Sequence, residues 1–168
     1  PTYIKGLKSG TTSISGRGSS SDTDYPRTDR FYGELEDYVP SSDGIANIDL
    51  KRTAFGLKFI VTPPVDGTLS VGSIASNIKI SSDDSTVETS AIYTFYDVYK
   101  CWKVEEYTQN FTIRLTWIRA NGATQTFEKV ITVKRNVMTT VNVNVNGGTT
   151  DSSLGVKEDD TPMGNENV

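Results

Sequence analysis

The sequence predicts an all-β protein, an antiparallel β-sandwich, and three observations carry this prediction. Apolar and polar residues alternate along most strand-like segments, as expected when one strand face meets a core and the other meets water. Turn signals separate these segments at spacings of about 8–12 residues, which is typical of a sandwich or barrel. No segment shows the periodicity of an amphipathic helix. We expect about seven to nine strands in one domain, because a chain of 168 residues is long enough for one core.

The first 43 residues are rich in Ser, Gly, Thr and Asp. We expect this segment, residues 1–43, to pack on the domain or to be partly mobile, with short edge strands or an ordered loop at residues 2–7 and 29–38. Its aromatic residues Phe31, Tyr32 and Tyr38 are expected to anchor it on the sandwich.

The sandwich core is predicted over residues 44–146, with early strands at 44–50, 52–62, 68–71 and 74–81. Pro63 and Pro64 end the second of these, because proline supplies no N–H to a ladder. Residues 89–104 are aromatic-rich and predict one long strand or two strands broken near Asp97. Three alternating strands follow at 111–118, 125–133 and 137–146. Residues 147–168 hold few apolar side chains and predict a polar, flexible tail.

The apolar rows of the first two of these three strands predict their register. A two-residue loop at Asn121-Gly122 would place Leu115 opposite Glu128, although cross-strand neighbours point to the same face. A three-residue loop, with Gly122 left-handed at a bulge, places Leu115 opposite Phe127 instead. We therefore predict the three-residue loop.

Aromatic side chains cluster between residues 93 and 102. In an extended chain Tyr93, Phe95 and Tyr99 share one face, and Tyr96 and Trp102 share the other. One set is expected in the core, and the other either lies under residues 1–43 or forms an exposed platform for stacking on sugars. The single cysteine, Cys101, is expected to be a buried, inert thiol.

The composition excludes several function classes. Histidine is absent and one cysteine cannot build a thiolate cage, so Ser-His-Asp chemistry and His- or Cys-based metal sites are excluded. There is no phosphate-binding Gly-rich loop, and the net charge of −4 argues against nucleic acid. No run approaches the ~20 apolar residues of a membrane helix. We predict no catalytic, cofactor-binding or metal-ligating residue set, and no cofactor.

Acidic residues offer two weaker possibilities, and solvated surface charge is favoured over both. A carboxylate pair for glycoside hydrolysis could come from Glu88, Asp97, Glu105, Glu106 and Glu128. Calcium could be held by loop aspartates, although they lack the spacing of an EF-hand: Asp22, Asp24, Asp83, Asp84, Asp159 and Asp160.

Three segments together resemble the fimbrillin-like proteins, the type V pilin and surface-lipoprotein superfamily of Bacteroides-type bacteria. They are DRFYGELEDY (residues 29–38), LKRTAFGLKFIV (50–61) and VITVKRNVMTTVNVNV (130–145). Within them, Arg52 and Ala54 stand in the family's opening-strand pattern, and Lys134-Arg135-Asn136 in its late motif before a strand. The resemblance implies a transthyretin-like sandwich with Greek-key connections, exported to the cell surface or outer membrane as a lipoprotein.

The resemblance also implies partners and an assembly route. In that family a protease removes an N-terminal strand after an arginine, and a neighbour's strand fills the groove. Arg17, Arg27 and Arg30 lie in the N-terminal part, where exposed loop arginines are the expected interpretation. The chain is long enough for one sandwich rather than two, which fits an accessory, tip or anchor subunit as well as a pilin. Since the chain starts at Pro1, we expect its export signal and lipid anchor to lie outside it.

The sequence therefore predicts a non-enzymatic structural or adhesive protein of the cell surface, a pilus subunit or accessory subunit that can assemble by β-strand addition. Its expected partners are other surface or pilus subunits, a glycan or a host surface, with no nucleic acid and with membrane contact only through an anchor. The alternative is a glycan-binding module that uses exposed Tyr and Trp side chains.

Overall fold

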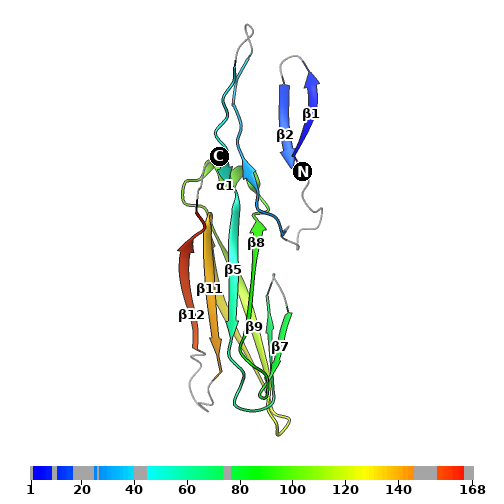
Figure 1. Cartoon of the computed structure of the whole chain (residues 1–168), viewed down its shortest axis with the longest axis vertical. Helices are drawn as coiled ribbons and strands as arrows, with labels where there is room; N and C mark the ends of the chain where they lie inside the picture. Colours follow the sequence, from blue (N-terminus) through cyan, green and yellow to red (C-terminus); the bar gives the residue numbers. More distant parts are fainter. Residues whose placement is uncertain are drawn as a thin grey trace.

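A computed structural model describes residues 2–8, 11–16, 25, 27–39, 45–73, 77–145 and 155–164. Eight strands, β5 to β12, form two four-stranded sheets that pack against each other (Figure 1). The expected all-β sandwich is confirmed. Its long axis runs along the strands, and the only helix among the described residues, α1 (Val98–Lys103), lies at one end.

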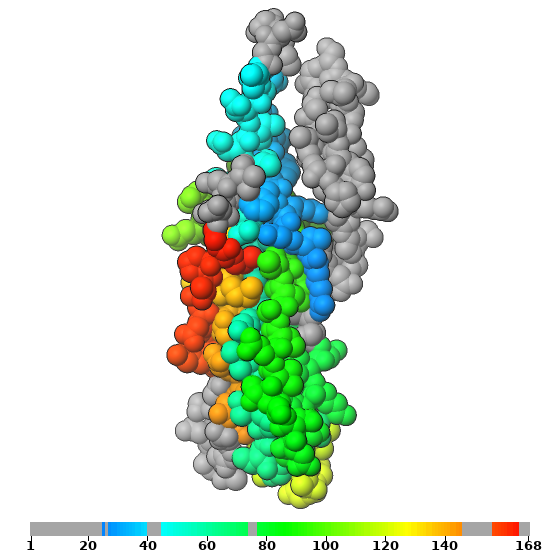
Figure 2. Space-filling model, viewed as in Figure 1, coloured from blue at the N-terminus to red at the C-terminus, as the bar shows by residue number. Residues whose placement is uncertain are grey.

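The first sheet has the order β12-β11-β5-β8. Its strands are β5 (Ala54–Val61), β8 (Val87–Thr94), β11 (Val137–Asn144) and β12 (Gly155–Pro162). Figure 2 shows the outer face of this sheet, with the four strands side by side. One pair departs from the predicted antiparallel arrangement, because β5 and β11 run parallel, with Gly56 beside Met138.

The second sheet has the order β10-β9-β6-β7. Its strands are β6 (Thr68–Gly72), β7 (Asn77–Ser81), β9 (Thr108–Ile118) and β10 (Thr124–Lys134). The chain crosses between sheets after β5, β7, β8 and β10. As a result β8 returns to pair with β5 and β9 returns to pair with β6, which is the long-range return of a Greek key.

The predicted register of the β9–β10 hairpin is confirmed. Leu115 lies opposite Phe127, and Phe111 lies opposite Ile131. The Arg119 N–H donates to the Ala123 carbonyl at 2.8 Å, which leaves a three-residue loop, and Gly122 has a φ of +83°. The left-handed glycine absorbs the extra residue, so both apolar rows reach the core.

The core lies between the two inner sheet faces and follows the predicted alternation. Both faces contribute large apolar side chains, and several aromatic rings cluster around Phe55 near the start of β5. The rings of Phe55 and Phe95 lie 4.6 Å apart between centroids, and Phe55 and Phe111 lie 5.5 Å apart. Tyr25 joins this group, edge-on to Phe55 and Phe111. The sandwich is therefore closed at this end by a residue from outside the two sheets.

The predicted strand over residues 89–104 is wrong beyond Thr94. The chain turns at Asp97, whose carboxylate accepts the Lys100 N–H at 2.9 Å and begins α1. Lys100 and Lys103 lie in the last turn, where positive charge suits the helix dipole. Capping and end charges produce a short helix that apolar periodicity could not reveal over six residues.

The C-terminal segment also differs from its prediction as a polar tail. Residues 155–162 form β12, which pairs antiparallel with β11 along its whole length. Only Val156 of this strand packs against the core cluster, because β12 is an edge strand with charged side chains. The sandwich consequently extends past residue 146. Residues 147–154 lie outside the described part.

The start of the sandwich differs too, since the predicted strand over residues 44–50 does not form in the described residues 45–50. Strands β3 (Phe31–Tyr32) and β4 (Lys51–Arg52) make a short two-stranded ladder. Beyond it, residues 33–39 and 45–50 continue as two extended limbs that project past α1 (Figure 1). A Cβ on Gly33 would overlap the Asp49 carbonyl oxygen, so the limbs touch at their base. We call residues 33–39 and 45–50 the arm.

The N-terminal residues form a separate pair of strands, β1 (Thr2–Lys8) and β2 (Thr11–Gly16). They pair with each other, and neither joins one of the four-stranded sheets. Of the three predicted anchors, Phe31 lies under the Arg52 guanidinium and Tyr32 packs edge-on to Trp102, whereas Tyr38 is exposed. Within the described ranges, no helix is long and apolar enough to cross a membrane.

Candidate functional site

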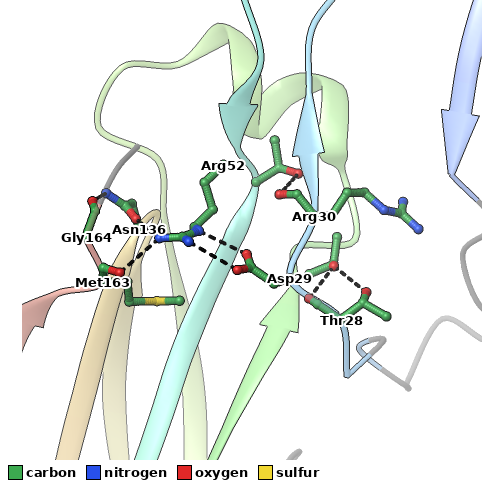
Figure 3. A network of polar contacts seen from close by, with 9 residues as sticks. Thr28, Asp29, Arg30, Arg52, Asn136, Met163 and Gly164 are labelled. Carbon is green, nitrogen blue, oxygen red and sulfur yellow. Dashed lines mark hydrogen bonds and ion pairs between the residues drawn. The ribbon is translucent and has the colours of Figure 1, made fainter. Parts of the chain in front are cut away.

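Four chain segments meet around the side chain of Arg52 at the end of the sandwich near α1 (Figure 3). The guanidinium donates from Nε and Nη2 to the two carboxylate oxygens of Asp29, at 2.9 and 3.1 Å. Its Nη1 donates to Asn136 Oδ1 at 2.8 Å and to the Met163 carbonyl at 3.1 Å. This charge-assisted fork joins the N-terminal segment, β4, the β10–β11 turn and the end of β12.

Asn136 completes this junction through its backbone. It has a left-handed φ of +59°, a conformation that asparagine tolerates better than most residues. Its N–H donates to the Ala54 carbonyl at 2.8 Å, and its own carbonyl accepts the Met163 N–H at 2.9 Å. The two motifs of the fimbrillin-like resemblance therefore touch each other, although Arg52 and Asn136 are 84 residues apart. Sequence reasoning recognised both motifs as strand patterns and missed the contact.

A second cluster joins α1 to the arm through aromatic and charged side chains. Tyr99 donates its hydroxyl proton to Glu36 at 2.7 Å, and Lys103 forms an ion pair with the same carboxylate. The Lys103 ammonium also lies over the rings of Tyr99 and Trp102, at 5.6 and 5.1 Å from their centroids. Burial and the hydrogen bond to Glu34 raise the pKa of Tyr32 to about 12. All these contacts fix the base of the arm.

The predicted sugar platform forms only in part. Tyr93 and Phe95 are core residues, as one face of the predicted strand should be. Tyr96 and Tyr99 are 58% and 46% exposed beside α1, although the Lys103 ammonium lies over the Tyr99 ring. Tyr99 and Trp102 are inclined to each other by 51°, and Trp102 is half-buried. These two rings therefore do not form one flat surface.

The candidate carboxylates are dispersed over the molecule, and the structure brings none of them together as a catalytic pair among the described residues. Glu88 pairs with Lys58, Glu128 with Arg114 and Glu105 with Lys51. Asp97 caps α1, and Glu106 is exposed beside Glu105.

The candidate metal ligands and the single thiol also form no reactive cluster among the described residues. In the part of the chain that the structure describes, no three His, Cys, Asp or Glu side chains gather as a metal site requires. Asp22 and Asp24 lie outside that part. The buried position predicted for Cys101 is confirmed, and burial raises the pKa of its thiol to about 12. A thiol with this pKa stays protonated near neutral pH and is a poor nucleophile.

The edges of the two sheets are the remaining surface with binding potential, because an edge strand presents unpaired backbone groups. Edges β10 and β12 lie on the same side of the sandwich, where charged side chains link them. Lys129 points inward from β10 and lies 3.8 Å from Glu158 of β12, and Lys134 lies 2.6 Å from Asp160. Thr132 N–H approaches the other oxygen of Glu158 at 3.5 Å. Inward charge and occupied backbone groups protect this side against further strands.

Comparison with known proteins adds no relative to these observations. No protein-family model, no curated protein and no solved structure matches the chain.

Proposed function

We propose that this protein is a non-catalytic structural or adhesive subunit of a cell surface, built to contact other subunits. The observation that carries the proposal is the arm. Five large apolar side chains are exposed along its two limbs. Exposed apolar side chains that lie together on a surface usually mark a protein–protein contact. They are Leu35, Tyr38, Val39, Ile45 and Ile48.

The surroundings of the arm support this proposal. The base of the arm is fixed to α1 by side-chain contacts. Tyr32 packs edge-on to Trp102, and Tyr99 donates a hydrogen bond to Glu36 of the arm. The limbs therefore project from a supported base. Meanwhile the polar groups that could serve chemistry are engaged in ion pairs and caps that stabilise the scaffold. A rigid sandwich that presents an apolar arm suits assembly better than catalysis. The resemblance to fimbrillin-like proteins points to export, a lipid anchor and assembly by strand addition.

The proposal is tested on intact cells of the producing organism and with matched variants. We expect antibodies to label the protein on unpermeabilised cells, and external protease to remove it. The variant Ile45→Ser should reduce its incorporation into surface complexes, because Ile45 is 90% exposed on the arm. Val65→Ser is the control, since Val65 is 60% exposed but lies in the β5–β6 connection. Exclusive intracellular labelling would refute the proposal. Equal incorporation of the two variants into surface complexes would show that the arm is not the contact surface.

The alternative is a glycan-binding module, and the exposure of Tyr96 and Tyr99 favours it. Aromatic rings stack on the apolar faces of sugars, and both tyrosines lie on the same short segment. Calorimetry with a panel of soluble polysaccharides tests this function. Binding should be lost in Tyr99→Ala and retained in Val65→Ala. Absence of binding to every polysaccharide in the panel would count against the alternative.

A further inference from the structure

The four sheet edges are not equally protected, and β8 is the exception. Edges β10 and β12 are linked by ion pairs, and β12 carries four charged residues in succession. Edge β7 has only five residues. By contrast β8 has eight residues and one charged side chain, Glu88, which points to the outer face and pairs with Lys58. A long edge with little charge is the kind that accepts another strand.

The pairing of β8 with β5 determines which backbone groups of β8 point out of the sheet. The Phe95 N–H donates to the Thr53 carbonyl, so the odd-numbered residues of β8 exchange hydrogen bonds with β5. The even-numbered residues Glu88, Ser90 and Ile92 therefore direct their N–H and C=O groups away from the sheet. No strand of the described chain pairs with this edge. Its inward side chains Thr89 and Ala91 are small and only half-buried, which leaves room beside β8.

The chain also contains a strand pair that lacks a sheet. Strands β1 and β2 pair only with each other. An isolated two-stranded hairpin is at best marginally stable in water and gains stability when a third strand or a core joins it. The eight-residue strand β8 and the seven-residue strand β1 thus each have one edge that no strand of the described chain pairs with.

Charge favours pairing between these two elements. Residues 2–16 include Lys5 and Lys8 and no acidic residue. Glu88 of β8 already pairs with Lys58, but Asp83 and Asp84 are exposed in the loop that leads into this edge. Opposite charges across a new strand pair contribute to register and to partner choice.

We propose that the β1–β2 hairpin of one copy adds to the β8 edge of a second copy and extends the β12-β11-β5-β8 sheet across two molecules. Backbone hydrogen bonds from residues 88, 90 and 92 hold the added strand. Each copy offers one hairpin and one edge, so the contact is head-to-tail and repeats along a filament. This inference rests on the proposed function, since it names the contact through which the subunits assemble.

The test compares two proline variants by sedimentation of the full chain over a range of concentrations. Ser90→Pro removes an N–H that points out of the sheet, so it blocks addition to β8 without removing a ladder hydrogen bond. Val130→Pro is the matched control, because the β9–β10 register also directs the residue 130 N–H out of its sheet. We expect the unmodified chain and Val130→Pro to self-associate, and Ser90→Pro to do so about tenfold more weakly or less.

A deletion of residues 1–16 provides the second variant and leaves the sandwich sequence unchanged. It should abolish self-association, and added hairpin peptide should then bind the deleted chain but not its Ser90→Pro form. Protection of Cys101 from thiol reagents reports that each variant is folded. Three results would overturn the inference: a monomer at every concentration, association that survives Ser90→Pro, or association that survives the deletion. A monomer that still labels on intact cells would leave the proposed surface function standing.

Discussion

Gly67 gives the sharpest test of how the β5–β6 turn is held, because a single methyl group there meets backbone. Its φ is +72°, and a Cβ at this position would overlap the Ile118 carbonyl oxygen and lie 2.9 Å from the Arg119 Cα. The left-handed conformation alone costs a non-glycine residue about 1–2 kcal/mol. Relief of the overlap requires movement of the turn or of the end of β9, and such overpacking costs about 1–3 kcal/mol more. We therefore expect Gly67→Ala to destabilise the fold by about 3 kcal/mol.

Gly122 is the matched control, since it shares the conformation but not the crowding. Its φ is +83°, and an added Cβ would meet nothing within 4 Å. Gly122→Ala should cost only the left-handed penalty, about 1 kcal/mol. Urea unfolding followed by circular dichroism measures both free energies of unfolding, with equal slopes required for a valid comparison. Equal destabilisation by the two variants would refute the reasoning, because the overlap at Gly67 would then cost nothing.

Three further predictions concern polar groups and the thiol. Arg52→Ala should lower the free energy of unfolding by about 2 kcal/mol, because it removes the charge-assisted hydrogen bonds that join Asp29, Asn136 and Met163. Urea unfolding checks this, and a loss below about 0.5 kcal/mol contradicts it. The Arg119 guanidinium, with help from the Ala120 N–H, lowers the pKa of Asp66, so its stabilisation is complete above the unfolded value of about 3.9 and is lost as pH falls through the folded pKa. Acid titration of the free energy of unfolding should accordingly be flatter below about pH 4 in Asp66→Asn than in the unmodified protein, and parallel curves would contradict this. Cys101 should resist iodoacetamide at pH 8 in the folded protein and react after unfolding, whereas fast labelling of the folded protein would contradict its burial.

Alternation was sufficient to predict the central strands, because each has one face on the core. The β9–β10 loop could even be predicted to the residue, since only one loop length places Leu115 opposite Phe127. The same rule failed at β12, where a charged sequence pairs through its backbone with β11 and buries little. It also failed at residues 45–50, which alternate as a strand would but lie on the projecting arm. Apolar periodicity indicates whether a side chain faces the core, but it does not identify an edge strand that is held by backbone pairing.

The candidate surfaces were less accessible to sequence reasoning. The aromatic residues between 93 and 102 were recognised, but the Asp97 cap changed their faces by starting a helix. The Arg52 junction depends on a contact between Arg52 and Asn136, and nothing in a single sequence records a contact over that separation. The available signal was the asparagine itself, since an asparagine before a strand often marks a left-handed turn, and Asn136 has a positive φ.

The parallel pairing of β5 with β11 has a consequence for how the chain folds. Strand β5 supplies Phe55, Leu57, Phe59 and Val61 to the core, yet its neighbour β11 lies near the other end of the chain. The hairpins β6–β7 and β9–β10 can form as soon as their residues are available, and β5 can pair with β8, while its other edge stays unpaired until β11 is in place. Non-local pairing of this kind slows folding and exposes intermediates to aggregation. A factor that shields β5 until β11 arrives should therefore raise the yield of refolded protein more than one that acts on the hairpins.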